Sequence, residues 1–194
     1  MKIKIAVTGG IGSGKSTVIK FLQKRGCAVF SCDAIYKNLL LDKSYIEKLQ
    51  NLFPAAVVNG KVDTKKLSEI IFNDEKARKR LNDLSHPSIM QKLYTEMEES
   101  ADELVFAEVP LLFEGGYEKD FNVVIVVVRD KVERIKSICE RDNVTTDEAL
   151  KKINTQYNYD DYLITLQEQG AYILTNVSLK KLENDVEEIL KRLS

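Results

Sequence analysis

Four residues near the N-terminus have the types and the spacing that bind a polyphosphate. Gly9, Gly14, Lys15 and Ser16 match the pattern G-x-x-x-x-G-K-[ST], and they stand between an apolar run and a helical pattern. Because glycine lets the backbone curl, successive N–H groups can point at phosphate oxygens, and the N-terminus of the following helix adds a favourable dipole. We expect Lys15 to reach the β- and γ-phosphates of a nucleotide and the Ser16 hydroxyl to ligate Mg²⁺.

The phosphate loop alone does not choose between a switch, a motor and a kinase. A GTP-binding switch would also carry Asn-Lys-x-Asp and Asp-x-x-Gly, and neither string occurs in the sequence. A motor ATPase usually has an apolar run that leads directly into Asp-Glu, whereas here residues 123–128 lead into Arg129-Asp130. A small-molecule kinase fits best, because its helical insertions can close over two substrates and exclude water.

The elements that position these residues alternate between apolar runs and helical patterns. This alternation is typical of parallel strands joined by crossover helices. Five strands are expected, at residues 2–8, 27–31, 104–109, 123–128 and 171–176. The third and fourth are apolar on both faces, as in the buried strands of a parallel sheet. A helix is expected from Ser16 to Arg25, with Gly26 at its C-cap. The pattern therefore predicts an α/β fold with a parallel five-stranded sheet flanked by helices.

Two polar helical regions interrupt this alternation. In the first, the sequence indicates a turn at Asn59-Gly60 and a helix that starts near Ser85-His86-Pro87, since proline suits the first helical position. In the second, Thr145 and Glu148 have the spacing of a capping box. The chain is expected to be one domain, residues 1–194, with a core at about 1–34, 101–130 and 170–194 and helical insertions at about 35–100 and 131–169.

Asp33 is the candidate for the group that orients the acceptor. Phosphoryl transfer to a hydroxyl needs a carboxylate nearby, and ligands of parallel α/β sheets lie beyond the carboxyl ends of the strands. Asp33 follows the second expected strand and meets this requirement. The alternative is that it caps the helix containing Ile35 and Leu39, a role that Asp fills well.

Three further residues have open interpretations. Arg141 lies in the charged second insertion, where a guanidinium could span phosphate oxygens, or it could belong to an ordinary solvated helix face. His86, the only histidine, suits a helix cap or a packed position at least as well as catalysis. Glu108 could organise Mg²⁺ through water or simply end the third strand at the cleft.

The composition argues against several other classes. The chain has 194 residues and a net charge of −1, so electrostatics gives no reason to expect binding to nucleic acid or an anionic membrane. No stretch approaches the roughly 20 apolar residues of a membrane span, and no signal peptide is evident. Cys27, Cys32 and Cys139 form no CxxC pair, so neither a disulfide framework nor a zinc site is expected. We expect reduced thiols in a cytoplasmic protein and a monomer, with oligomers left open.

Several segments resemble the dephospho-CoA kinase family, in the same order along nearly the whole chain. "TGGIGSGKST" followed by "VFSCDAIYK" is similar to the start of that family. "NGKVDTKKLSEIIFNDEKARKRLNDLSHPSI" resembles its helical acceptor region, and "EVPLLFEGGYEKDFNVVIVVV" resembles its Pro-Leu-Leu segment with the following strand. "ERDNVT" resembles its lid, and the Asn of "ILTN" matches near the end.

This resemblance implies a P-loop NTPase fold with an acceptor-binding insertion and a lid. It implies that ATP, with Mg²⁺, phosphorylates the ribose 3′-hydroxyl of dephospho-CoA to give coenzyme A and ADP. The residues that match the loop for the ATP phosphates are Gly12, Ser13, Gly14, Lys15, Ser16 and Thr17. Asp33 matches the carboxylate at the acceptor hydroxyl and Arg141 the lid arginine. On the acceptor side the matching residues are His86, Pro110, Leu111 and Leu112.

The sequence also departs from the family. Ser31-Cys32-Asp33 stands where the family usually has Asp-Ala-Asp, and Cys32 therefore lies beside the expected base. Arginine is often found at the position of Thr64, where Lys65 and Lys66 are adjacent, and is common at Ser137 and around Tyr159 and Tyr162 in the lid. Tyrosine cannot replace the charge of a guanidinium but could stack on adenine. The alternatives are a related P-loop kinase for another nucleotide or nucleoside, or a nucleotide-binding protein with weakened catalysis.

Overall fold

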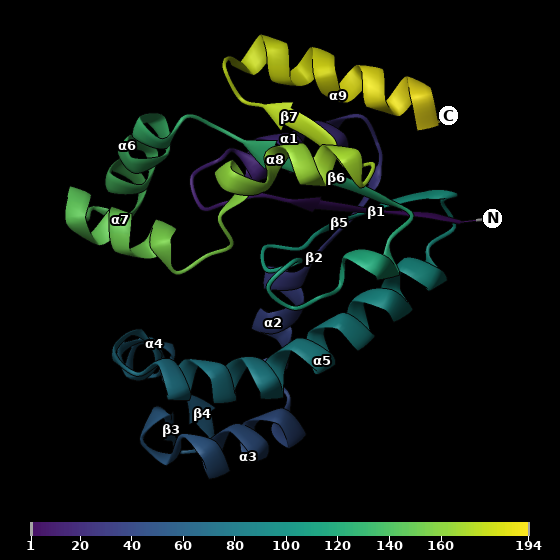
Figure 1. The fold of residues 1–194 in the computed structure, drawn as a ribbon. Helices are drawn as coiled ribbons and strands as arrows, with labels where there is room; N and C mark the ends of the chain where they lie inside the picture. The colour runs from purple at the N-terminus through teal and green to yellow at the C-terminus, as the bar shows by residue number, and fades with distance from the viewer. Residues whose placement is uncertain (1, 194) are drawn as a thin grey trace. The chain divides into compact units, whose positions relative to one another are not determined.

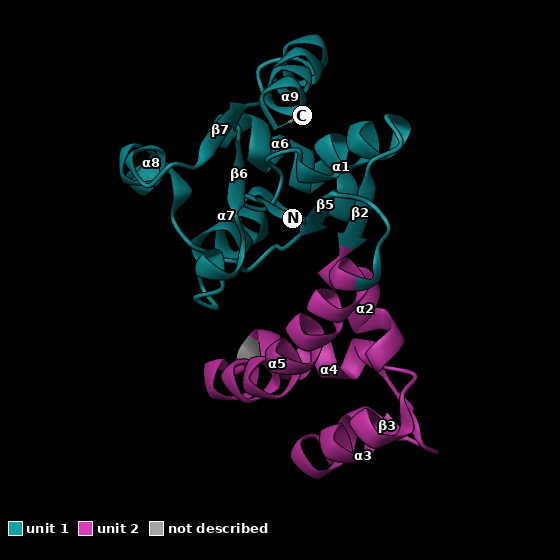
Figure 2. Cartoon of the chain, turned by 90° about the vertical axis from the view of Figure 1, so that its right-hand side faces the viewer, with its two compact units in different colours: residues 1–30, 99–194 teal, residues 31–98 magenta. Residues whose placement is uncertain are grey.

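The computed structural model describes residues 2–193, which divide into two compact units. The first contains residues 1–30 and 99–194, and the second contains residues 31–98, as the colours in Figure 2 show. The helices of the second expected insertion thus belong to the same compact unit as the sheet. The division of the chain into a core, an acceptor-binding insertion and a lid stays a prediction.

The first unit is built on a five-stranded parallel sheet with the order β2-β5-β1-β6-β7 (Figure 1). The strands are β1 (Ile3–Thr8), β2 (Ala28–Ser31), β5 (Leu104–Glu108), β6 (Val123–Val128) and β7 (Tyr172–Thr175). β1 is central and pairs in parallel with β5, where Val7 is opposite Glu108, and with β6, where Thr8 is opposite Val126. The predicted parallel α/β sheet is confirmed, with each of the five expected strands present to within two residues.

In the part of the first unit that the structure describes, the sheet is accompanied by five helices and one 3-10 turn. They are α1 (Lys15–Lys24), η2 (Glu118–Asp120), α6 (Lys131–Asp142), α7 (Thr146–Asn154), α8 (Tyr159–Glu168) and α9 (Leu179–Leu193). Gly26, with a φ of 78°, donates its N–H to the Gln23 carbonyl at 3.0 Å and ends α1 as predicted. The predicted capping box is also confirmed, because the Thr145 and Glu148 side chains each bond the other residue's backbone at the start of α7.

The sheet has an apolar core on both faces because strand side chains alternate between them. On one face, Val7 and Val127 belong to a buried cluster that also includes side chains of α1 and α9. On the other face, Val126 packs with Tyr159 and Leu166 of α8. The uninterrupted apolar run of β6 is thus explained by burial on two sides, as its sequence predicts.

The second unit is helical around a short hairpin. Its elements are α2 (Cys32–Leu39), α3 (Lys43–Leu52), η1 (Pro54–Ala56), β3 (Val57–Val58), β4 (Lys61–Val62), α4 (Thr64–Asn73) and α5 (Glu75–Glu99). Asn59 and Gly60, with φ angles of 52° and 70°, form the predicted turn between β3 and β4. The core of the unit includes Tyr45, Leu49 and Leu81.

The prediction of a helix start near Ser85-His86-Pro87 is wrong. α5 begins instead at Glu75, after Asp74 accepts hydrogen bonds from the backbone N–H groups of Lys76 and Ala77, and it continues through Pro87. Proline in a helix costs about 3 kcal/mol. This cost is offset by burial of seven α5 side chains, namely Ala77, Leu81, Ser85, Ile89, Met90, Leu93 and Met97. The buried face of the long helix therefore overrides the local preference of proline.

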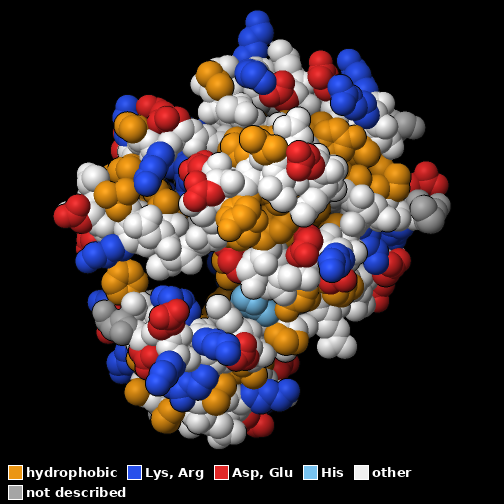
Figure 3. Space-filling model, viewed as in Figure 1, with side chains coloured by type: hydrophobic (Ala, Val, Ile, Leu, Met, Phe, Trp, Pro, Cys, Tyr) orange, Lys and Arg blue, Asp and Glu red, His pale blue; other side chains and the backbone are white. Residues whose placement is uncertain are grey.

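The surface carries both signs of charge. On the face shown in Figure 3, basic and acidic side chains are interspersed with apolar ones, in line with the net charge of −1. Within residues 2–193, no helix has the length and apolar character that a membrane span requires.

Candidate active site

The phosphate loop connects the central strand β1 to α1. It therefore leaves the carboxyl end of a strand that has a parallel neighbour on each side, which is where α/β sheets bind ligands. Gly14, at the N-cap of α1, has a left-handed backbone with a φ of 104°. A Cβ at this position would lie 2.2 Å from Nδ2 of Asn176, which donates a hydrogen bond to the Ser13 carbonyl at 2.9 Å. The residue after β7 thus holds the loop, and it leaves no room for a side chain.

Lys15 bonds the carbonyl groups of its own loop. Its Nζ donates to the Gly9 carbonyl at 2.6 Å and to the Gly10 carbonyl at 3.1 Å. The lysine stem is flexible, so these bonds do not fix the ammonium group permanently, and its expected contact with nucleotide phosphates stays a prediction. Ser16 is exposed in the first turn of α1, so its hydroxyl is accessible. Ser13 Oγ is buried and has no hydrogen-bond partner among the described residues.

The donor set fits Mg²⁺ that is bound together with a nucleotide. Across residues 2–193, no three His, Cys, Asp or Glu side chains are grouped so that they could hold a metal ion. Nucleotide-bound Mg²⁺ needs no such group, because it keeps several waters and takes phosphate oxygens with only one or two protein oxygens. The exposed Ser16 hydroxyl at the loop is a suitable protein oxygen.

Two side chains from the far part of the sequence, Gln156 between α7 and α8 and Tyr159 at the start of α8, contact the loop and the end of β1. Ile11 donates its N–H to Oε1 of Gln156 at 2.6 Å. The Tyr159 hydroxyl forms a buried hydrogen bond with Oγ1 of Thr8 at 2.9 Å. Burial raises the pKa of Tyr159, and hydrogen bonds from Thr8 and the Gly9 backbone oppose that rise only in part. The phenol is therefore neutral and fixes the residue that enters the loop.

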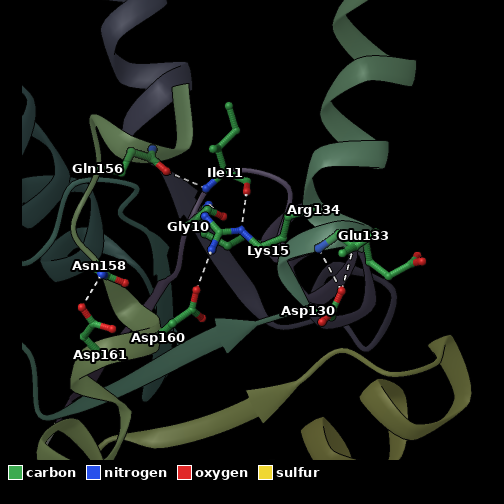
Figure 4. Close-up of polar contacts among 11 residues, drawn as sticks. Gly10, Ile11, Lys15, Asp130, Glu133, Arg134, Gln156, Asn158, Asp160 and Asp161 are labelled. Carbon is green, nitrogen blue, oxygen red and sulfur yellow. Dashed lines mark hydrogen bonds and ion pairs between the residues drawn. The ribbon is translucent and has the colours of Figure 1, made fainter. Parts of the chain in front are cut away.

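Arg134 of α6 also contacts the loop. Its Nε donates to the Ile11 carbonyl at 3.0 Å, and its Nη1 lies 3.5 Å from Oδ2 of Asp160 (Figure 4). Our reading of the sequence missed Arg134, Gln156, Tyr159 and Asn176 as loop contacts. One local signal was available for Arg134, because it lies four residues before Ile138 and shares that residue's buried face of α6.

Arg141 is in the last turn of α6 and is engaged on the helix surface. Its Nε donates to Oδ1 of Asp142 at 2.7 Å and its Nη2 to Oδ2 at 3.1 Å, while 59% of its side chain is exposed. Hydrogen bonds from Arg141 and then from Lys152 hold the pKa of Asp142 well below its usual range. Arg141 would have to exchange Asp142 for phosphate oxygens in order to act as a lid arginine, which stays a prediction.

The second unit holds the other predicted polar residues. Asp33 is exposed in the first turn of α2, and the N-cap position belongs to Ser31, so the alternative that Asp33 caps this helix is not what the structure has. His86 is half-buried in the middle of α5. Beside it, Ser85 is buried and its hydroxyl bonds that of Tyr45 at 2.7 Å.

The segment after β5 is tied to the start of α8. Leu112 is fully buried, whereas Pro110 and Leu111 are half-buried. Phe113 stacks on Tyr157 with ring centroids 5.1 Å apart, and the Tyr157 N–H donates to Oε1 of Glu114 at 2.8 Å. The predicted acceptor-side residues 110–112 thus precede residues that contact the 156–162 segment directly.

The tyrosines of the 156–162 segment have different surroundings. Tyr159 is 2% exposed and belongs to the core, so it presents no ring face to solvent. Tyr162 is 48% exposed, with its ring centroid 5.2 Å from that of Tyr157. Ser137 is half-buried on α6. Of the two tyrosines, Tyr162 alone has an accessible ring.

A parallel sheet with a glycine-rich phosphate loop after its central strand defines the fold of the P-loop kinases. The structure of shikimate kinase from Bacteroides thetaiotaomicron shares this fold, with a TM-score of 0.51 at 14% identity over 98% of each chain. The chain belongs to the dephospho-CoA kinase family, because the sequence model of that family matches residues 3–179.

Similar proteins support this assignment over the whole chain. Dephospho-CoA kinase from Fusobacterium nucleatum is 34% identical over 186 residues, or 94% of each chain, and that from Thermus thermophilus is 33% identical over 99% of this chain and 92% of its own. A crystal structure of a Thermus thermophilus protein has a TM-score of 0.85 at 32% identity, and covers 100% of this chain and 98% of its own. Dephospho-CoA kinase from Campylobacter jejuni has a TM-score of 0.66 at 25% identity over the same shares of the two chains.

Proposed function

We propose that this chain transfers the γ-phosphoryl group of ATP to the ribose 3′-hydroxyl of dephospho-CoA and releases coenzyme A and ADP. The observation that carries this proposal is the family match over residues 3–179, combined with a fully formed phosphate loop after β1. We further propose that the protein acts as a monomer in the cytoplasm, with residues 35–100 binding the acceptor and residues 131–169 acting as the lid.

In this proposal the phosphate loop receives the ATP phosphates. The backbone N–H groups of residues 12–17 bind phosphate oxygens, and Lys15 leaves the Gly9 and Gly10 carbonyls to contact the β- and γ-phosphates. When bound, Mg²⁺ neutralises charge on the same phosphate oxygens, and Ser16 supplies its protein ligand. Arg141 exchanges its contact with Asp142 for the transferring group, since a guanidinium can span two of its oxygens.

On the acceptor side, Asp33 orients the 3′-hydroxyl and takes its proton as the oxygen–phosphorus bond forms. The bond from the γ-phosphorus to the β–γ bridging oxygen breaks, and ADP leaves with that electron pair. His86 and residues 110–112 bind dephospho-CoA. The exposure of Asp33 in the first turn of α2 supports this role, because an exposed carboxylate is accessible to an acceptor hydroxyl.

The test is ADP release from Mg-ATP with dephospho-CoA, compared with adenosine, AMP, CMP and no acceptor. We expect release with dephospho-CoA alone, and coenzyme A as the product detected by mass spectrometry. Release with a different acceptor would replace the proposal by a related nucleotide or nucleoside kinase. ATP binding without turnover of any acceptor would indicate a nucleotide-binding protein with weakened catalysis.

A further inference from the structure

Arg134 is a buried cation whose charge is only partly compensated. The residue is 4% exposed, yet the carboxylate with which it pairs is at the limit of hydrogen-bond distance: Oδ2 of Asp160 is 3.5 Å away, on a side chain that is 48% exposed. Burial lowers the pKa of Arg134, but arginine stays protonated in proteins. A positive charge thus remains on a guanidinium that is almost completely removed from water.

This guanidinium lies directly against the phosphate loop. A Cβ at Gly10 would be 2.4 Å from Nη2 of Arg134, and a Cβ at Gly12 would be 2.8 Å from the Arg134 carbonyl oxygen. Gly10 and Gly12 therefore leave the space that Arg134 occupies. The guanidinium lies against Gly10 and the Ile11 carbonyl, next to residues 12–17, which are expected to bind the ATP phosphates. Its positive charge is therefore close to the place where the anionic oxygens would bind.

Arg134 also fixes the orientation of a loop peptide. Its Nε donates to the Ile11 carbonyl, while the Ile11 N–H donates to Oε1 of Gln156. Both polar backbone groups of Ile11 are therefore held by the 131–169 segment. The Gly10–Ile11 peptide is held through its N–H and the Ile11–Gly12 peptide through its carbonyl, so neither peptide rotates freely, and the direction of the neighbouring N–H groups depends on them.

We propose that Arg134 is a positioning residue for ATP binding, which holds the Ile11–Gly12 peptide and adds positive charge behind the phosphate loop. Asp160 moderates that charge from the start of α8. The inference rests on the proposed function only in taking ATP as the ligand of the loop. It concerns nucleotide affinity and not the identity of the acceptor.

The test is the Kd of Mg-ATP, measured by titration calorimetry without acceptor, in Arg134→Met, Arg134→Lys, Asp160→Asn and Lys136→Met. Arg134→Met removes charge and hydrogen bonds and should weaken binding about tenfold or more, as expected for the loss of charged hydrogen bonds. Arg134→Lys keeps the positive charge but not the planar set of guanidinium donors, so it should raise the Kd of Mg-ATP about threefold. Asp160→Asn leaves the bond to Ile11 and removes a negative charge, so it should tighten binding about twofold.

Lys136→Met is the matched control, because Lys136 is exposed on the same helix and the substitution also removes one positive charge. The Kd of Mg-ATP for this variant should stay within about twofold of the wild-type value. Thermal unfolding without nucleotide verifies that each variant is folded. In steady-state assays, Arg134→Met should raise KM for ATP and leave KM for dephospho-CoA nearly unchanged.

A purely structural role predicts something different. Arg134→Met and Asp160→Asn would then lower the unfolding temperature together and weaken ATP binding alike, and that result would overturn the inference. So would an unchanged Kd in folded Arg134→Met. A wild-type chain that binds ATP but phosphorylates no dephospho-CoA would refute the proposed function and leave this inference standing, whereas a wild-type chain without affinity for Mg-ATP would overturn both.

Discussion

Replacement of Tyr159 by phenylalanine should destabilise the protein through one buried oxygen atom. The Tyr159 hydroxyl bonds Oγ1 of Thr8 at 2.9 Å and also takes part in a hydrogen bond with the Gly9 backbone. Tyr159 is 2% exposed and Thr8 is fully buried, so water cannot replace the lost hydroxyl without disturbing the core. A buried polar group that loses its partner costs about 1–3 kcal/mol, and we expect a loss of about 2 kcal/mol in the free energy of unfolding.

A double-mutant cycle with Thr8→Val separates the hydrogen bond from the loss of packing. Thr8→Val alone should cost about 1 kcal/mol because it leaves the tyrosine hydroxyl without this partner. In the Tyr159→Phe background the same change should cost almost nothing, which gives a coupling energy of about 1 kcal/mol. Urea unfolding followed by circular dichroism provides the four free energies.

Tyr162→Phe is the control, since Tyr162 lies on the same helix and is 48% exposed. It should change the free energy of unfolding by no more than about 0.5 kcal/mol. Strictly additive costs in the cycle, or equal losses in Tyr159→Phe and Tyr162→Phe, would refute the reasoning that a buried hydroxyl pair holds the end of β1.

Three further outcomes are expected. Burial raises the pKa of Tyr159 and of Tyr36, so these phenols ionise at lower pH in the unfolded state than in the folded state. The free energy of unfolding should therefore fall as pH rises above about 10, by up to about 1.4 kcal/mol per pH unit for each phenol. Urea titration between pH 9 and 11 should give a flatter profile in Tyr159→Phe, which would confirm that Tyr159 contributes to the pH dependence. Asp33→Asn should cut kcat by at least about a hundredfold while the Kd for ATP changes less than about twofold, and unchanged kcat would remove Asp33 from the mechanism. Gly14→Ala should lower the free energy of unfolding by about 1–2 kcal/mol because of the φ of 104° at this position. It should also weaken ATP binding, because the added Cβ displaces Asn176 from the Ser13 carbonyl. Gly26→Ala, which has open space around its Cβ, should affect stability alone.

The sequence was sufficient for the sheet and for the phosphate loop because their constraints are local. A run such as residues 123–128 is apolar at every position, and that pattern can be satisfied only where both faces of a strand are covered. Gly14, Lys15 and Ser16 likewise follow one another in the order that the loop geometry requires. Helix ends marked by Gly26, and by Thr145 with Glu148, were predictable for the same reason.

A helix start was predicted wrongly, and contacts with the phosphate loop were not predicted, where residues distant in the sequence determine the local structure. Pro87 remains inside α5 because side chains of that helix are buried along its length, which no local rule at Ser85-His86-Pro87 contains. Tyr159 and Arg134 contact residues 151 and 123 positions away, so their partners are fixed only by the fold. A charged or aromatic residue in a polar helical region resembles a surface residue until its neighbours are known.

The contacts of α8 limit how the proposed lid could close. Tyr159 and Leu166 are buried against Val126, and burial of one such side chain stabilises the fold by about 1.5–3 kcal/mol. Separating α8 from the sheet would expose this apolar surface and lose that stabilisation. The N-terminal half of α6 is held as well, through Arg134. Arg141, by contrast, is exposed in the last turn of α6, next to α7. A movement that brings Arg141 to the phosphates therefore costs least if it is confined to α7 and the end of α6, with α8 and the phosphate loop remaining fixed.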